Sequence, residues 1–234
     1  EMTLEEYKKA SEKRLEINIK HMEKGVRFVD INTAYIDEGV IIGEGTLIGP
    51  CVTLVGKTEI GADCVILQNT RIVDSVIADH VEIQSSVIVE SSVGEGTKVG
   101  PFAYMRPGSR VGKNCKVGDF VEIKNSSFGD GSKASHLTYI GDSDVGCDVN
   151  LGCGVVFVNY DGTNKYRSTV GDGAFIGCNS NLVSPVTVGD GAYVAAGSTV
   201  TENVEADALY IARARGTKKQ GWVSSKGILK KKKK

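Results

Sequence analysis

The chain has 234 residues, with 29 glycines, 4 prolines, 6% aromatic residues and a formal net charge of −1. This near-neutral balance argues against a nucleic-acid binder that depends on overall charge, and we expect neither a signal peptide nor a membrane span. The six cysteines lack paired CxxC spacing, which favours free thiols in a reducing cytoplasm over a disulfide framework or a zinc site.

The first predicted element is a charged amphipathic helix over residues 3 to about 24, with Gly25 as its C-cap. Its apolar side chains are expected to form one stripe: Leu4, Tyr7, Leu15, Met22 and Val26. Because the chain begins at Glu1 without a start methionine, we expect it to be part of a longer protein. Residues 1–28 are assigned to this arm helix.

From residue 36 onward, aliphatic residues recur every six positions. The clearest run is Val93, Val99, Met105, Val111, Val117 and Ile123. Upstream the anchors are Ile36, Ile42, Ile48, Leu54, Ile60, Ile66 and Ile72, and then, after a slip of one residue, Ile77, Ile83 and Val89. Downstream they are Phe128, Ala134, Ile140, Val145, Leu151 and Phe157, and, after a longer gap, Val170, Ile176, Leu182, Val188, Val194 and Val200.

A period of six fits neither an α-helix nor the simple alternation of a hairpin. It predicts an all-β solenoid in which each unit is one short strand plus a corner, with roughly nine coils over residues 36–203. Each anchor, and the small residue four positions later, should face the interior, while the residues on either side of the anchor face outward. Gly, Asn and Asp suit the corners because they tolerate positive φ. Residues 29–206 are assigned to this β-helix.

Two segments depart from the repeat. Thirteen steps separate Phe157 from Val170 where six are expected, which predicts a loop that can carry Lys165 back over the solenoid. From the spacing alone, a functional loop and a tolerated insertion are equally good interpretations. Residues 207–234 form a C-terminal extension that ends in a disordered run of lysines, Lys230 to Lys234.

The register brings two cations together. Arg106 and Lys124 each follow an inward anchor, so they should stack on adjacent coils about 4.8 Å apart. Two cations at this spacing repel unless an anion lies between them, and a phosphate suits both side chains. The alternative is a solvated charged ladder balanced by Glu122, and the pair alone does not decide between the two.

A histidine lies next to these cations. His136 is at the corner that leads into the strand of Tyr139, and Asn150 lies on the next coil of the face that carries His136. An unperturbed imidazole titrates at about pH 6.5, which suits a general base. Together with the cations, these residues indicate a site for a small phosphorylated ligand and a proton transfer.

Longer stretches of the sequence resemble a known family. GPFAYMRPGS, GDFVEIKNS, GSKASHLTYIGD, VNYDGTNKY and SPVTVG are similar to motifs of the hexapeptide-repeat acyltransferases, as is a Gly-Trp pair near the end. The resemblance is closest to the C-terminal acetyltransferase domain of the bifunctional bacterial enzymes that make UDP-N-acetylglucosamine, and it spans nearly the whole chain. It implies a left-handed parallel β-helix that assembles as a homotrimer. The uridylyltransferase domain of those enzymes has no counterpart here.

The resemblance also implies roles. The implied reaction moves the acetyl group of acetyl-CoA to the 2-amine of glucosamine-1-phosphate, in the cytoplasm and without a metal, for cell-wall precursor synthesis. His136 resembles the general base. The sugar-phosphate set is Arg106, Lys124, Tyr139, Asn150 and Lys165, with Glu122 on the same face. The acetyl-CoA set is Cys153, Asn159, Tyr160, Cys178, Ala196 and Arg213. Cys153 and Cys178 depart from the family, which commonly has Ala and Ser there.

Three alternatives remain open. A related sugar or amino-acid O-acetyltransferase would use the same thioester, although the stacked cations favour a phosphorylated acceptor. A metal-dependent hydratase on a similar solenoid would need three converging histidines, whereas His21, His80 and His136 are scattered in register. A purely structural solenoid would leave the polar residues unexplained.

Overall fold

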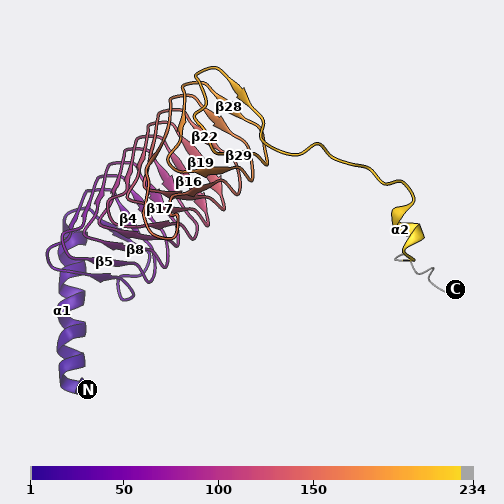
Figure 1. The fold of residues 1–234 in the computed structure, drawn as a ribbon. Helices are drawn as coiled ribbons and strands as arrows, with labels where there is room; N and C mark the ends of the chain where they lie inside the picture. Colours follow the sequence, from indigo (N-terminus) through magenta and orange to yellow (C-terminus); the bar gives the residue numbers. More distant parts are fainter. Residues whose placement is uncertain (1, 228–234) are drawn as a thin grey trace.

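The computed structural model describes residues 2–227, in which short strands stack coil upon coil into a parallel β-helix (Figure 1). The predicted all-β solenoid with an N-terminal helix is confirmed. Its sides are three parallel sheets of eleven, ten and nine strands, named here sheets A, B and C. The predicted disordered run Lys230 to Lys234 lies outside the described residues.

Successive strands along the chain contribute to the three sheets in turn. Sheet A consists of β1 (Arg27–Phe28), β4 (Leu47–Ile48), β7 (Val65–Ile66), β10 (Glu82–Ile83), β13 (Lys98–Val99), β16 (Lys116–Asp119), β19 (Lys133–His136), β22 (Asn150–Leu151), β25 (Phe175–Ile176), β28 (Tyr193–Val194) and β30 (Leu209–Tyr210). Sheet B consists of β2 (Tyr35–Ile36), β5 (Thr53–Val55), β8 (Arg71–Val73), β11 (Val87–Val89), β14 (Tyr104–Met105), β17 (Glu122–Lys124), β20 (Tyr139–Gly141), β23 (Val156–Val158), β26 (Asn181–Val183) and β29 (Thr199–Val200). Sheet C consists of β3 (Ile41–Ile42), β6 (Glu59–Ile60), β9 (Val76–Ile77), β12 (Ser92–Val93), β15 (Arg110–Val111), β18 (Ser127–Phe128), β21 (Ser143–Val145), β24 (Ser168–Val170) and β27 (Thr187–Val188).

The inward side chains fill one continuous apolar core. Anchors such as Met105 and Ile123 are fully buried, and so are the small residues four positions after an anchor, such as Thr97. One predicted anchor is wrong. Ile88 is the buried residue of β11 and Val89 is half-buried, because the step from the preceding anchor is five residues rather than six.

Residues at the corners often have positive φ, as expected for Asn and Asp; examples are Asn125 (45°) and Asp142 (48°). The corner between sheets A and B also holds three bulky residues in this conformation, Phe102 (59°), Phe120 (55°) and Leu137 (49°). All three are exposed, and the rings of Phe102 and Phe120 stack with their centroids 5.4 Å apart. A left-handed backbone costs a residue with a side chain about 1–2 kcal/mol, so this exposed apolar corner is locally strained.

The arm helix α1 (Leu4–Glu23) covers the predicted residues, but its C-cap is Lys24 rather than the predicted Gly25. The side chain of Thr3 accepts a hydrogen bond from the amide of Glu6, whose carboxylate binds back to the amide of Thr3, which forms a capping box. Gly25, with φ of 88°, lies just past the last turn and its amide donates to the carbonyl of Met22.

The predicted apolar stripe of α1 is wrong. Three of its members are exposed: Leu4, Tyr7 and Met22. The helix instead buries Asn18 and His21 against the first coil. The Asn18 amide donates to the carbonyls of Ile31 (2.9 Å) and Ala34 (3.1 Å), which would otherwise lack partners as the chain enters the solenoid.

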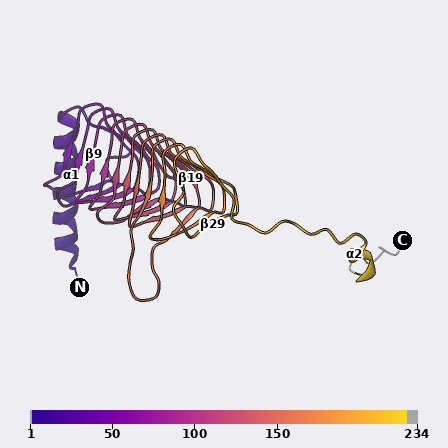
Figure 2. The ribbon, with the colours of Figure 1, turned by 45° about the horizontal axis from the view of Figure 1, so that its top comes forward.

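Two segments leave the regular coils. The predicted loop between β23 and β24 projects from the side of the solenoid (Figure 2). After β30 the chain runs away from the last coil in an extended conformation and leads into the short helix α2 (Trp222–Ser225) (Figure 1). Over the described part of the chain, no helix is long and apolar enough to cross a membrane.

Candidate functional site

The polar residues selected by the six-residue register lie on the outer face of sheet B. Met105 of β14 pairs with Ile123 of β17, which in turn pairs with Ile140 of β20. The outward residues beside these anchors therefore form two columns. One column is Tyr104, Glu122 and Tyr139, and the other is Arg106, Lys124 and Gly141. We call these two columns the sheet-B face. The predicted stacking of Arg106 and Lys124 on adjacent coils is confirmed.

Each cation of the sheet-B face has a carboxylate partner. Nη1 of Arg106 lies 2.9 Å from Oε1 of Glu122, and Nζ of Lys124 lies 2.9 Å from Oδ2 of Asp142. The hydrogen bond that Arg106 donates to Glu122 raises the pKa of Arg106, and the one that Lys124 donates to Asp142 raises the pKa of Lys124. Glu122 is thus a counterion, as in the charged-ladder alternative. Asp142, which sequence reasoning missed, balances the second cation.

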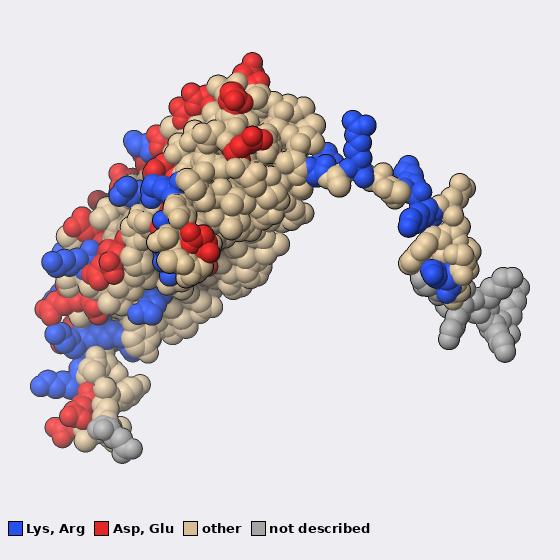
Figure 3. Space-filling view, viewed as in Figure 1, with Lys and Arg blue, Asp and Glu red and all other residues tan. Residues whose placement is uncertain are grey.

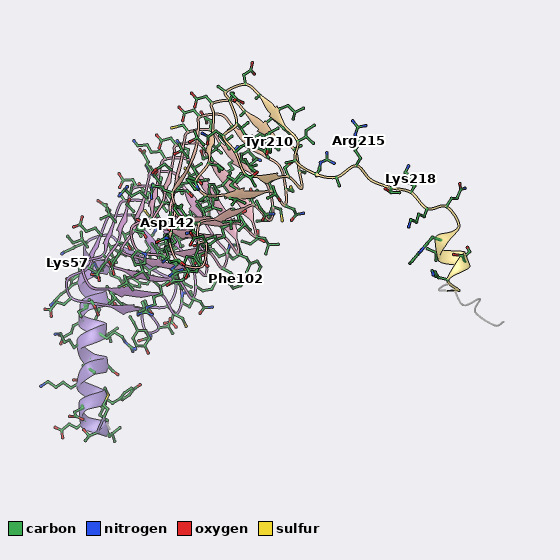
Figure 4. The ribbon with its side chains drawn as sticks, viewed as in Figure 1. Lys57, Phe102, Asp142, Tyr210, Arg215 and Lys218 are labelled. Atoms are coloured by element: carbon green, nitrogen blue, oxygen red, sulfur yellow. The ribbon has the colours of Figure 1, made fainter. Side chains whose placement is uncertain are left out.

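Asp142 connects Lys124 to two amides. Its Oδ2 also accepts from Nδ2 of Asn159 at 2.5 Å, and its Oδ1 accepts from Nδ2 of Asn125 at 2.7 Å. Burial raises the pKa of this carboxyl, but the hydrogen bonds from Asn125, Lys124 and Asn159 outweigh burial and lower it overall. Asp142 therefore stays ionised at neutral pH and holds Lys124 in place midway along the solenoid (Figure 4).

Tyr139 lies over a glycine on its own strand. A Cβ placed on Gly141 would be 2.4 Å from Oη of Tyr139 and 2.6 Å from its Cζ, so only glycine leaves room for the ring in this position. Nδ2 of Asn159 reaches Oη of Tyr139 at 3.5 Å. The phenol thus spans the sheet-B face from one edge toward the other, where the long loop begins.

The long loop is tied down at its far end. Arg167 binds both carboxylate oxygens of Asp144 in β21 and donates from Nη1 to the carbonyl of Asn125 at 2.9 Å. The guanidinium lowers the pKa of Asp144 to about 2. With Asn159 bound to Asp142 at the near end, both ends of the loop are held at the corner between sheets B and C.

The loop brings a third cation to the sheet-B face. Lys165 is bridged to Tyr160 across the loop, and its side chain is a neighbour of Lys124. Arg106 is paired with Glu122 and Lys124 with Asp142, whereas Lys165 forms no ion pair among the described residues. The excess of one positive charge suits an anionic ligand.

His136 belongs to the neighbouring edge, where sheet A meets sheet B. Its Nδ1 lies 2.5 Å from Oδ1 of Asp119, its direct partner on the previous coil. The hydrogen bond from His136 lowers the pKa of Asp119, so the carboxylate is ionised. When Nδ1 carries the ring proton toward Asp119, Nε2 is left as an acceptor, which is the tautomer that a general base needs.

The same edge carries most of the predicted acetyl-CoA residues. The registers of β19 with β22, of β22 with β25 and of β25 with β28 place one residue per coil beyond His136. These residues are Cys153, Cys178 and Ala196, and with Asp119 and His136 we call them the edge ladder. Arg213 follows at the end of the edge ladder, with its Cδ 3.8 Å from the Cβ position of Gly197.

Three predicted site residues lie outside the group in which they were expected, that is, the sheet-B face for the sugar-phosphate set and the edge ladder for the acetyl-CoA set. Asn150 faces outward on sheet A, between Lys133 and Phe175 of the adjacent coils. Asn159, predicted to bind acetyl-CoA, is buried against Asp142 and belongs with the sheet-B face. Tyr160 lies in the loop and donates to the carbonyl of Gly162 at 2.6 Å.

Sequence reasoning missed four acidic or basic residues of the site: Asp119, Asp142, Asp144 and Arg167. A signal for Asp119 is present, since it precedes His136 by one 17-residue coil and is its register partner. Asp142 and Asp144 likewise follow polar register partners, Asn125 and Ser127, by one 17-residue coil. Their cationic partners carry no such signal, because Lys124 reaches Asp142 around a corner and Arg167 reaches Asp144 from the loop.

The candidate site is an open surface in a single chain. A cleft of about 460 Å³ lies elsewhere, between α1 and the first coils, lined in part by Tyr7, Arg14 and Tyr35. Within residues 2–227, no group of three or more His, Cys, Asp or Glu side chains is placed to hold a metal ion. His21 and His136 lie on separate elements, α1 and β19.

The chain is similar to known proteins over most of its length. Residues 90–125 and 167–202 match the family model described as bacterial transferase hexapeptide (six repeats). The chain is 55% identical over 214 residues to the bifunctional protein GlmU of Clostridium beijerinckii, which is 92% of this chain and 47% of that protein. It is 56% identical over 213 residues to the GlmU of Clostridioides difficile, which is 91% of this chain and 46% of that protein. The chain thus spans about half the length of the curated relatives it matches.

A solved structure shares the fold. LpxA, a UDP-N-acetylglucosamine acyltransferase from Bacteroides fragilis, superposes with a TM-score of 0.56 over 78% of this chain and 70% of that one. The two sequences are 18% identical, so this likeness concerns the solenoid alone.

Proposed function

We propose that this chain transfers the acetyl group of acetyl-CoA to the 2-amine of glucosamine-1-phosphate. The proposal is made for a chain that belongs with the hexapeptide-repeat transferases and is homologous to the bifunctional GlmU proteins. The observation that carries the proposal is the meeting of two groups at one corner. The cationic sheet-B face borders the edge ladder, on which His136 is paired with Asp119.

The phosphate is bound by Arg106, Lys124 and Lys165. Arg106 offers a planar fork of donors and the two lysines offer compact charges, and both kinds of donor bind phosphate oxygens well. Glu122 and Asp142 hold Arg106 and Lys124 before the ligand arrives, which reduces the entropy lost on binding. Tyr139, lying across the same face, contacts the sugar ring.

His136 accepts the proton of the attacking amine at Nε2. The amine nitrogen bonds to the thioester carbonyl carbon, the C–S bond then breaks, and the sulfur leaves as a thiol with a proton from the imidazolium. Asp119 orients the ring and stabilises the charge that the imidazole acquires.

The acetyl-CoA lies along the edge ladder. Cys153 is the register neighbour of His136, so a thioester over Cys153 and Cys178 is one or two coils from the base. Arg213, which lies over Gly197 at the far end, binds an anionic group of the cofactor in this proposal. Asn159 and Tyr160 are assigned to the acetyl-CoA set by the family resemblance, and Asn150 to the sugar.

The same proposal includes a homotrimer in the cytoplasm that serves UDP-N-acetylglucosamine and cell-wall precursor synthesis. The exposed corner of Phe102, Phe120 and Leu137 lies beside His136, and a neighbouring subunit would cover it. The extension projects from the solenoid with Lys and Arg along it and no acidic residue on the side shown (Figure 3), so it can reach an anionic ligand on a second subunit. Sedimentation equilibrium of the full chain tests this assembly.

The deciding experiment measures release of the CoA thiol with two acceptors, glucosamine-1-phosphate and glucosamine. Turnover that depends on the phosphate supports the proposal. Preference for an unphosphorylated sugar or an alcohol acceptor would favour an O-acetyltransferase instead, and no thiol release with any amine or alcohol would leave the chain a structural solenoid.

A further inference from the structure

Two cysteines lie directly above one another on the edge ladder. Leu151 pairs with Ile176, and each is followed two residues later by a cysteine, Cys153 and Cys178. The amide of Asn179 donates to the carbonyl of Cys153 at 2.8 Å, so this register continues around the corner. Adjacent coils are about 4.8 Å apart, which is within the Cα separation of about 4.4–6.8 Å that disulfides bridge.

The upper thiol leans toward the lower coil. A Cβ placed on Gly152 would lie 2.9 Å from Cα and 3.0 Å from Sγ of Cys178, so Cys178 sits above the glycine that precedes Cys153. Because Gly152 has no side chain, nothing on that residue separates the two thiols. Both cysteines are free, with Cys178 exposed and Cys153 half-buried.

The other cysteines lack this arrangement. Cys64 and Cys115 are buried, and their thiols donate to carbonyls at 3.1 Å, which favours unreactive thiols. Cys147 is exposed like Cys178, but its register neighbours are Asp130 and Asp172. Cys147 is therefore a matched control for a corner cysteine without a partner.

We propose that Cys153 and Cys178 form a redox-sensitive dithiol that closes into a disulfide joining two coils of the same chain. One thiolate attacks a low-molecular-weight disulfide such as glutathione disulfide and releases one thiol. The second thiolate attacks the resulting mixed disulfide and releases the other. The S–S bond of the reagent breaks and the Cys153–Cys178 bond forms. Two electrons pass to the reagent, and two protons end on the released thiols.

The bond is expected to stop acetyl transfer, a consequence that rests on the proposed function. Cys153 is next to His136 on the edge ladder, and the disulfide would pull both sulfurs into the surface along which the thioester is proposed to lie. An exposed bond in a reducing compartment is labile, so the change is reversible by thiols.

Peptide mapping tests the bond without reference to activity. The full chain is oxidised with glutathione disulfide, its remaining thiols are alkylated, and it is cut with trypsin after Lys and Arg. Cys178 then lies in the fragment 168–213, whereas Cys153 shares the fragment 134–165 with Cys147. We expect these fragments to be linked within one chain, two hydrogen atoms lighter than their sum, and to stay linked in Cys147→Ala.

The link should be absent from Cys153→Ala and from Cys178→Ser. A link that is lost in Cys147→Ala, a link between separate chains, or full alkylation of Cys153 and Cys178 after oxidation would each overturn the dithiol.

A second measurement tests the consequence. A shift of about 1 Å at a reacting centre can cost about 100-fold in rate, so oxidised chain is expected to lose at least about tenfold in kcat/KM for acetyl-CoA and to regain it with dithiothreitol. Cys147→Ala should respond like the parent. Cys153→Ala, whatever its starting activity, should no longer respond to the oxidant.

A chain that carries the mapped disulfide and keeps full activity would overturn the regulatory role. An inactive reduced chain would overturn the proposed function and leave the bond to be judged by mapping.

Discussion

Nδ1 of His136 lies 2.5 Å from Oδ1 of Asp119, and the two residues are direct partners on adjacent coils. The contact joins an exposed imidazole to a carboxylate that stays ionised because the hydrogen bond from His136 lowers its pKa. A carboxylate in this position fixes the tautomer of the ring and stabilises the imidazolium that forms when a proton arrives. The edge ladder thus begins with a base and the residue that orients it.

Removal of either residue should lower kcat rather than substrate affinity. Loss of a general base costs about 10²–10⁴-fold, so His136→Ala is expected to lose that much in kcat with little change in KM. Asp119→Asn keeps the base and should lose only part of this contribution, about tenfold. Asp119→Glu should restore part of the loss, because it returns the charge. Steady-state thiol release checks all three. Normal turnover by His136→Ala would refute its role as base, and a loss confined to KM would remove Asp119 as an orienting group.

Lys124→Ala should weaken the binding of the phosphorylated acceptor. A hydrogen bond to a charged group contributes about 1.5–3 kcal/mol, which corresponds to a rise of about 10–100-fold in KM for glucosamine-1-phosphate. The fold should persist, because Asp142 keeps Asn125 and Asn159 as donors. Lys98→Ala removes a lysine paired to Glu82 on sheet A and serves as the matched control. Equal losses with glucosamine and its 1-phosphate would show that Lys124 does not read the phosphate.

The strands could be predicted from the sequence because a strand alternates its side chains with a period of two. Once an anchor such as Met105 or Ile123 is known to be buried, the outward direction of Arg106 and Lys124 follows, and their stacking follows from the coil length. The long loop was recognisable for the same reason, since it interrupts a regular count.

The corners and the arm helix could not be predicted in the same way. At a corner the chain turns through positive φ, so the direction of a side chain such as that of Asp142 is not fixed by alternation. The docking face of α1 includes the buried Asn18 and its two hydrogen bonds to backbone carbonyls, and a hydrophobic pattern does not report a polar contact of this kind. The position of Ile88 does not follow from a fixed period because coil length varies: the coil from Ile72 to Ile88 has 16 residues and the coil from Ile88 to Met105 has 17.

Gly141→Ala should displace Tyr139 without unfolding the solenoid. The new Cβ would overlap the phenol at 2.4 Å, and the ring can swing outward because it lies at the surface. If the ring binds the sugar, KM for the acceptor should rise by about tenfold, the effect of one lost contact of about 1.4 kcal/mol. Gly39→Ala, whose nearest contact would be 3.4 Å, is the control for adding a methyl group. The double variant Gly141→Ala/Tyr139→Ala should be no worse than Tyr139→Ala, and additive losses would disprove the coupling.

The ion pair of Arg167 with Asp144 should make the anchoring of the long loop sensitive to acid. The pKa of Asp144 falls from its ordinary value of 3.8 to about 2, because Arg167 binds the charged form. The stabilisation is therefore complete above about pH 4 and is lost as the pH falls toward 2. Both side chains are two-fifths exposed or more, so solvent screening limits the contribution to about 0.2–1 kcal/mol.

Asp144→Asn should lower the free energy of unfolding in urea at pH 7 by this small amount. Between pH 4 and pH 2.5 the variant should lose less of its free energy of unfolding than the parent does. Trypsin cleavage after Lys165 and Arg167 should also be faster in the variant at pH 7, because the far end of the loop is released. An unchanged cleavage rate, together with the same acid-dependent loss as the parent, would show that this pair does not hold the loop.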